Sequence, residues 1–172
     1  MPKTAFIRPQ VTTKAGFSFA IVASQYNNTY VQPLVEFATA EISELEPRAH
    51  ISVVRVPGSF EIPLAVKLVA MQRQCDGIVA LGVVLQGETA HAELIARSVT
   101  EALMRLALEF SVPVIHEVLF LKNEEQAKAR CLGPKLNRGL EAARVAVAMA
   151  RTVKQLSSNE KYGCPARGPR SG

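Results

Sequence analysis

The chain has 172 residues, of which 48% are apolar and 20% charged, with no tryptophan, as is typical of one globular domain. Lys and Arg outnumber Asp and Glu by 20 to 15, but residues 17–156 carry 14 basic and 14 acidic side chains. The net charge of +5 therefore belongs to the two ends, which argues against a nucleic-acid-binding face. Three scattered cysteines argue against a disulfide framework or a zinc site, and no apolar run approaches the roughly 20 residues of a membrane span.

The two ends differ from the body of the chain. Residues 1–16 lack a sustained hydrophobic period, and residues 157–172 are rich in Ser, Gly and Pro and carry a basic excess. We expect both segments to be flexible or lightly docked, and residues 17–156 to form the folded domain. The N-terminus has basic residues but no apolar stretch behind them, which predicts a cytoplasmic protein without a secretory signal.

Short apolar segments alternate with longer amphipathic ones along the body of the chain. Strands covered on both faces are indicated where apolar side chains are nearly continuous, at residues 19–23, 51–56, 78–85 and 112–119. Helices are indicated where apolar side chains recur at helical spacing, at residues 31–45, 62–70, 95–110 and 140–150. Asn27, Asn28 or Thr29 could cap the first helix, which Pro47 ends.

The alternation of strand and helix predicts an α/β fold. We expect a three-layer αβα sandwich around a flavodoxin-like sheet of four parallel strands, with or without a further edge strand from the N-terminal segment. In such folds ligands bind at the carboxyl ends of the strands. The turns after the predicted strands are therefore the places to look for a site.

The turn after the third strand has the spacing of a phosphate-binding loop. The run Gly82-Val-Val-Leu-Gln-Gly87-Glu88-Thr89 matches G-x-x-x-x-G, but Glu88 occupies the position of the lysine that a P-loop needs, which argues against an NTPase. Backbone N–H groups at the start of the next helix can still hold one phosphate. His91 lies at this helix start. It is either a group that transfers protons near neutral pH or a hydrogen-bonded structural residue.

The turn after the second strand is the run Val56-Pro-Gly-Ser-Phe-Glu-Ile-Pro63. Its Pro-Gly pair indicates a turn and Ser59 a helix cap, and the simplest interpretation is a connection with Phe60 in the core. Glu61 fits that interpretation less well, because a carboxylate among apolar neighbours needs a partner, such as a polar ligand. Tyr26, at the end of the first strand, is either a stacking platform or the edge of the core.

Three cations lie within nine residues around a Gly-Pro helix break, namely Arg130, Lys135 and Arg138. Arginine is well suited to bidentate phosphate binding. A solvated basic surface is the more common meaning of such a cluster, and the residues alone leave both open.

Taken together, these runs resemble the 6,7-dimethyl-8-ribityllumazine synthase family. The likeness spans about residues 17–156 and is carried by four runs, in order and with matching spacing: Gln-Tyr-Asn (25–27), Pro-Gly-Ser-Phe-Glu-Ile-Pro (57–63), Gly-Glu-Thr-Ala-His (87–91) and Asn-Arg-Gly-Leu-Glu-Ala-Ala (137–143). The resemblance implies a transferase of riboflavin biosynthesis that condenses 5-amino-6-ribitylaminouracil with 3,4-dihydroxy-2-butanone 4-phosphate, releasing phosphate and water. It implies neither a metal nor an organic cofactor.

The resemblance also implies an assembly. Family members form pentamers with active sites between neighbouring subunits, and some build shells of sixty; the sequence leaves both sizes open. The expected partners are the two small substrates, further copies of the chain and riboflavin synthase, with no nucleic acid and no membrane.

Carried over residue by residue, the resemblance makes His91 the proton-transfer residue. It assigns the pyrimidine ring and ribityl chain to Tyr26, Asn27, Ser59, Phe60, Glu61, Val83, Val84 and Leu85, together with His116 from the neighbouring subunit. It assigns the substrate phosphate to Gly87, Glu88, Thr89, Arg130, Lys135 and Arg138, with Arg130 reaching in from the adjacent subunit.

Four positions depart from the family pattern. Gln86 replaces Arg or Lys, Ala92-Glu93 replaces an aromatic-Asp pair, His116 replaces Phe, and Pro134 replaces Lys. None of them removes a residue that the reaction needs. A non-catalytic descendant that binds a lumazine or a flavin is the alternative, and it predicts the loss of a catalytic residue, which the chain does not show.

Overall fold

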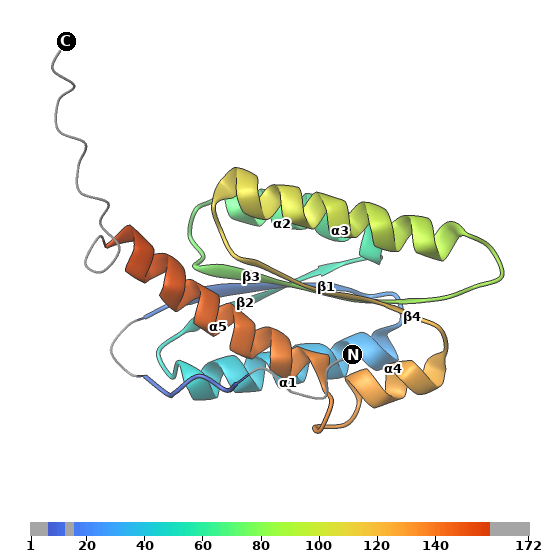
Figure 1. Ribbon diagram of the computed structural model, residues 1–172, viewed down its shortest axis with the longest axis horizontal. Helices are drawn as coiled ribbons and strands as arrows, with labels where there is room; N and C mark the ends of the chain where they lie inside the picture. The colour runs from blue at the N-terminus through green and yellow to red at the C-terminus, as the bar shows by residue number, and fades with distance from the viewer. Residues whose placement is uncertain (1–6, 13–15, 159–172) are drawn as a thin grey trace, which may run out of the picture.

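The computed structural model describes residues 7–12 and 16–158, and its centre is a sheet of four parallel strands (Figure 1). In sheet order β2-β1-β3-β4, the strands are β2 (His50–Val56), β1 (Ser18–Ser24), β3 (Gly77–Leu85) and β4 (Val114–Leu121). The predicted parallel sheet is confirmed. Residues 7–12, the described part of the N-terminal segment, add no edge strand to it.

β4 lies two residues further along the chain than its apolar run indicates. Ser111 ends the preceding helix in the left-handed region, with φ of 51°, so the chain is still turning there. Pro113 has no N–H to give to a sheet, and its carbonyl instead accepts the N–H of Ile78. Pairing with β3 therefore begins at Val114 and continues to Leu121.

Five α-helices of the described chain cover the two faces of the sheet and complete the predicted three layers (Figure 1). One face carries α1 (Asn28–Leu45), α4 (Glu124–Cys131) and α5 (Arg138–Ser157). The other carries α2 (Ile62–Met71) and α3 (His91–Phe110), with a short 3-10 turn, η1 (Ser59–Glu61), before α2. The flavodoxin-like sandwich is confirmed.

The core is divided in two by the sheet, and β1 supplies both halves. Phe19 and Ile21 pack with α1 and α5, whereas Ala20 and Val22 pack with α2 and α3. All four are at most 2% exposed. Burying one large apolar side chain contributes roughly 1.5–3 kcal/mol, so β1 is fixed firmly beneath the turn that follows it.

The start of α5 lies unusually close to α1. A Cβ at Gly139 would overlap the carbonyl oxygen of Leu34, so the approach of the two helices depends on a residue without a side chain. Asn137 caps α5 by accepting the N–H groups of Gly139 and Leu140.

Part of the N-terminal segment contacts this same face. Arg8 Nε lies 2.6 Å from Glu41 Oε1, and Arg144 Nε on α5 lies 2.8 Å from the same oxygen. Burial alone would raise the pKa of the Glu41 carboxyl, but the two guanidinium groups outweigh burial and lower it. The expected flexible tail at 157–172 lies, from residue 159 onwards, outside the described residues.

No helix in the described part of the chain combines the length and apolar character needed to cross a membrane.

Candidate active site

The carboxyl ends of β1, β2 and β3 open onto one cleft of about 770 Å³. Eleven of the residues that the sequence assigned to substrate line it: Tyr26, Asn27, Ser59, Phe60, Glu61, Val83, Val84, Leu85, Gly87, Thr89 and His91. The parallel sheet brings these segments together because all its strands end at the same edge.

The turn between β1 and α1 forms one wall. The N–H groups of Gln25 and Tyr26 donate to the carbonyls of Val56 and Pro57, which ties this turn to the end of β2. Asn27 has the left-handed φ of 57° and donates from Nδ2 to the Val83 carbonyl at 2.8 Å, instead of capping α1 through its side chain. Tyr26 is 72% exposed, which favours a stacking platform over the edge of the core.

The turn between β2 and α2 lines the cleft beside the turn between β1 and α1. Ser59 is buried, and a Cβ at Gly82 would lie only 2.8 Å from its Oγ, so Gly82 makes room for this hydroxyl. A Cβ at Gly58 would meet Glu61 Oε2 at 2.8 Å, which places the Glu61 carboxylate over the turn. The interpretation that Phe60 lies in the core is wrong, because this residue is 62% exposed and lines the cleft.

The third side of the cleft is the start of α3. His91 is the first residue of this 20-residue helix, and Ala90 before it provides no side-chain cap. Gly87 and Thr89 precede it and also line the cleft, whereas Glu88 does not. The first-turn N–H groups of a helix attract anions, so this corner suits a phosphate.

Four further residues of α3 line the cleft, although the sequence did not identify them as site residues: Ala92, Leu94, Ile95 and Ser98. His91, Leu94, Ile95 and Ser98 follow the i, i+3, i+4, i+7 spacing of one helix face. That spacing, counted from His91, was the signal that could have found Leu94, Ile95 and Ser98, but not Ala92. Gly58 was also missed as a lining residue.

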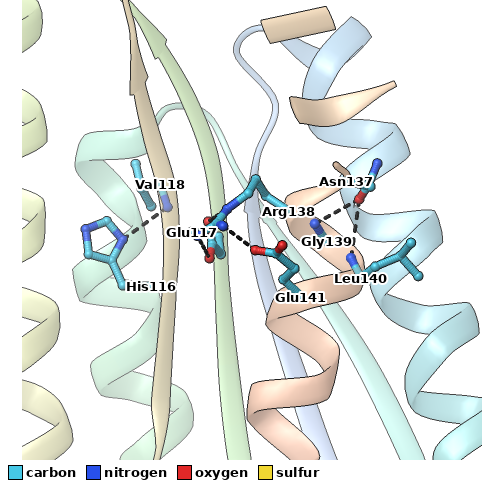
Figure 2. A network of polar contacts seen from close by, with 8 residues as sticks. All are labelled: His116, Glu117, Val118, Asn137, Arg138, Gly139, Leu140 and Glu141. Atoms are coloured by element: carbon cyan, nitrogen blue, oxygen red, sulfur yellow. Dashed lines mark hydrogen bonds and ion pairs between the residues drawn. The ribbon is translucent and has the colours of Figure 1, made fainter. Parts of the chain in front are cut away.

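The predicted phosphate cations lie elsewhere in the chain. No lysine or arginine lines the cleft among the residues described by the structure. Arg130 lies half-buried in the last turn of α4, and Lys135 is exposed in the connection to α5. Arg138 is occupied by Glu117 of β4 and Glu141 of α5 (Figure 2).

His116 and Glu117 point to opposite sides of β4 (Figure 2). His116 Nδ1 accepts the N–H of Val118 at 3.1 Å, and Nε2 lies 2.7 Å from Thr100 Oγ1. Because the Thr100 hydroxyl donates to the Ala96 carbonyl, Nε2 carries the proton and the ring is neutral. Burial lowers the pKa of His116, in agreement with this form, and His116 does not line the cleft of its own chain.

The chain is similar to known proteins of a single family. Residues 16–154 match the sequence profile of the family described as 6,7-dimethyl-8-ribityllumazine synthase. The protein of that name from Coxiella burnetii (strain Dugway 5J108-111) is 36% identical over 150 residues, which cover 87% of this chain and 99% of the relative. Its counterpart from Leptothrix cholodnii is 40% identical over 139 residues, covering 80% and 88%.

A third relative of the same name, from Polaromonas sp. (strain JS666 / ATCC BAA-500), is 36% identical over 142 residues, covering 82% of this chain and 90% of its own. A match of this extent over nearly the whole folded domain shows that the chain belongs to the 6,7-dimethyl-8-ribityllumazine synthase family, which acts in riboflavin biosynthesis.

Proposed function

We propose that this protein condenses 5-amino-6-ribitylaminouracil with 3,4-dihydroxy-2-butanone 4-phosphate to give 6,7-dimethyl-8-ribityllumazine, phosphate and water. The observation that carries the proposal is the meeting of three turns and one helix start at a single cleft, with a ring, a carboxylate and an imidazole facing it. The reaction joins two substrates, and the cleft offers a different chemistry to each.

The uracil and its ribityl chain fit the side formed by the ends of β1 and β2. Tyr26 offers an exposed ring on which the pyrimidine can stack, and Val83, Val84 and Leu85 offer an apolar floor with a strand backbone. The ribityl hydroxyl groups need donors and acceptors, which the Ser59–Glu61 turn supplies through its backbone and the Glu61 carboxylate.

The butanone phosphate fits the corner at the start of α3. We expect backbone N–H groups of Gly87, Glu88 and Thr89 and of the first helical turn to hold the anion there, whereas Glu88 is not among the residues that line the cleft. His91, the first residue of α3, lines the same cleft. An imidazole in that position can accept and return the protons of imine formation and elimination.

A second copy of the chain completes the site. A phosphate dianion calls for a cation, and the cleft of one chain has none among its described lining residues, whereas Arg130 has no carboxylate partner in the described chain. Exposed apolar side chains cover the outer faces of α2 and α3 and need a partner surface: Leu64, Leu68, Met71, Leu94, Met104 and Leu108. A neighbouring subunit would cover them and contribute Arg130, Lys135 and His116.

This arrangement supports assembly of pentamers, alone or in shells of sixty. The product of the reaction is the substrate of riboflavin synthase, which is therefore the protein partner that we propose.

The reaction begins when the free amine of the uracil attacks the ketone and water leaves, giving an imine. Elimination then removes a proton from the carbon that bears the free hydroxyl and phosphate from the next carbon, which leaves an enol that tautomerises to a new carbonyl. The ribitylamino nitrogen attacks this carbonyl and closes the ring with loss of water. His91 transfers protons, and the helix start with Arg130 stabilises the departing phosphate. Holding two substrates together can itself lower the barrier by up to about 7–11 kcal/mol, so replacing His91 should slow the reaction only modestly.

The purified protein tests the proposal when it is mixed with both substrates and lumazine absorbance is followed. We expect turnover, and we expect Arg130→Ala to raise the KM of the butanone phosphate. Lys128→Ala is the matched control, because Lys128 lies on the same helix and makes only an exposed pair with Glu124, at 3.7 Å. Binding of the lumazine without turnover would identify a non-catalytic descendant, and an unchanged KM in Arg130→Ala would refute the phosphate role of Arg130.

A further inference from the structure

Arg138, the first residue of α5, binds two carboxylates at once. Its Nη2 lies 2.8 Å from Glu117 Oε1 and its Nε lies 3.1 Å from Glu117 Oε2, which is a bidentate pair, while Nη1 contacts Glu141 (Figure 2). Glu117 is only 8% exposed. Each of the three guanidinium nitrogens of Arg138 thus contacts a carboxylate of its own chain.

The charges around Arg138 are unfavourable for binding a phosphate. Two acidic side chains face one basic side chain, so the group as a whole does not present a positive charge to an anion. Phosphate would have to displace Glu117 from a buried pair. Arg138 therefore differs from Arg130, which has no carboxylate partner in the described chain.

The Glu117–Arg138 pair anchors one end of a short connection. Asn137, beside Arg138, donates from Nδ2 to the Cys131 carbonyl at 2.6 Å and so ties the start of α5 to the end of α4. Arg138 ties the same point to β4 through Glu117. Residues 132–136, which include Lys135, are closed into a loop by the Asn137–Cys131 hydrogen bond, and Arg130 lies one residue before Cys131.

We propose that Glu117 and Arg138 are positioning residues, which hold the α4–α5 connection so that Arg130 and Lys135 meet the phosphate of the substrate bound in a neighbouring subunit. This role replaces direct phosphate binding by Arg138, which the sequence led us to expect. It rests on the proposed function, because the phosphate is that of the butanone substrate.

The direction in which phosphate affinity changes distinguishes direct phosphate binding by Arg138 from a positioning role. Glu117→Gln removes a negative charge, so a phosphate held directly by Arg138 would bind more tightly, whereas a misplaced connection would bind it more weakly. Arg138→Lys retains a positive charge but loses the bidentate pair. We therefore expect Glu117→Gln, Arg138→Gln and Arg138→Lys each to raise the KM of the butanone phosphate by roughly tenfold, within the range that a misplacement of about 1 Å can cause.

The double variant Glu117→Gln/Arg138→Gln provides a second criterion. Residues that act as one unit are not additive, so its KM should match that of either single variant. The KM of the uracil should change little, because neither residue lines the cleft, whereas kcat should fall to the extent that Arg130 no longer stabilises the departing phosphate. A role in folding alone would instead lower the active fraction without moving this KM.

Arg144→Gln is the matched control, because Arg144 makes a similar pair with Glu41 further along α5. Its KM values should equal those of the wild type, even if its Tm falls. An unchanged or lowered KM in Glu117→Gln, or a KM retained in Arg138→Lys, would overturn the proposal. A variant that folds poorly is replaced by Glu117→Asp, which keeps the charge but shortens the reach and should also raise the KM.

A wild-type protein without turnover would refute the proposed function instead. The pair would then be tested with inorganic phosphate by calorimetry. Weaker phosphate binding in Glu117→Gln would support the positioning role, and equal or tighter binding would overturn it.

Discussion

Asn27 joins the backbone of the first turn to the floor of the cleft, and its replacement tests how the site is held. Its φ of 57° and ψ of 38° lie in the left-handed region, and its Nδ2 donates to the Val83 carbonyl at 2.8 Å. Asparagine tolerates this backbone better than most residues with a Cβ. Two replacements therefore separate the backbone from the hydrogen bond.

Asn27→Ala loses both the hydrogen bond to Val83 and the tolerance of asparagine for the left-handed backbone. The hydrogen bond is worth about 1 kcal/mol and the left-handed backbone costs a residue with a Cβ about 1–2 kcal/mol, which together make about 2–3 kcal/mol. Asn27→Gly also loses the hydrogen bond, but glycine adopts the left-handed backbone without cost. The larger entropy of glycine in the unfolded state adds roughly 0.5 kcal/mol, so the glycine variant should be destabilised by about 1.5 kcal/mol in all. For a chain of this length 1 kcal/mol moves Tm by about 2–4 °C, so we expect decreases of about 4–12 °C for alanine and about 3–6 °C for glycine.

The assay is thermal unfolding at one fixed subunit concentration, together with the KM of the uracil substrate. Both variants should raise this KM, because the Val83 carbonyl loses its support at the edge of the cleft. A glycine variant less stable than the alanine variant would refute the role given to the left-handed backbone. Two variants as stable as the wild type would refute the role of the hydrogen bond as well.

Two other predictions concern packing and pH. Gly139→Ala should lower the free energy of unfolding by about 1–3 kcal/mol, because the new methyl overlaps a carbonyl of α1. Gly133→Ala should leave the free energy of unfolding unchanged, because a Cβ there meets nothing within 4 Å. Chemical denaturation of the two variants checks this, and equal stability of the two would contradict it. Burial lowers the pKa of His116, so below about pH 6.5 the unfolded chain binds a proton that the folded chain resists, and stability falls as the pH falls. Tm values between pH 7.5 and pH 5 should therefore fall less in His116→Phe than in the wild type, and parallel curves would show that His116 does not contribute.

The fold could be predicted from the sequence because its signals are local. Nearly continuous apolar runs mark strands that are covered on both faces, and β1, β2 and β3 lie where these runs are. The start of β4 could not be placed in this way, because the apolar run includes Val112 and Pro113, which the left-handed Ser111 and the missing proline N–H keep out of the sheet.

The cleft could be predicted as far as its residues lie in strand-end motifs. Phe60 was ambiguous, since an aromatic side chain in an apolar turn is equally suited to a core or to a ligand, and only the structure exposes its ring. The Glu117–Arg138 pair could not be found from the sequence, because its partners are 21 residues apart on a strand and a helix. A basic residue near a phosphate motif was therefore assigned to the phosphate before its carboxylate partner was known.

Lumazine forms at a site that two chains share, since one chain supplies the cleft and the next supplies Arg130. Glu61→Arg disables the cleft and Arg130→Ala weakens phosphate binding, so each variant alone should be nearly inactive at a butanone-phosphate concentration well below the KM of the Arg130→Ala variant. When the two are co-assembled in equal amounts, roughly a quarter of the interfaces join an intact cleft to an intact Arg130, and we expect about that fraction of wild-type lumazine formation. Mixed assemblies no more active than the two variants alone would contradict the shared site.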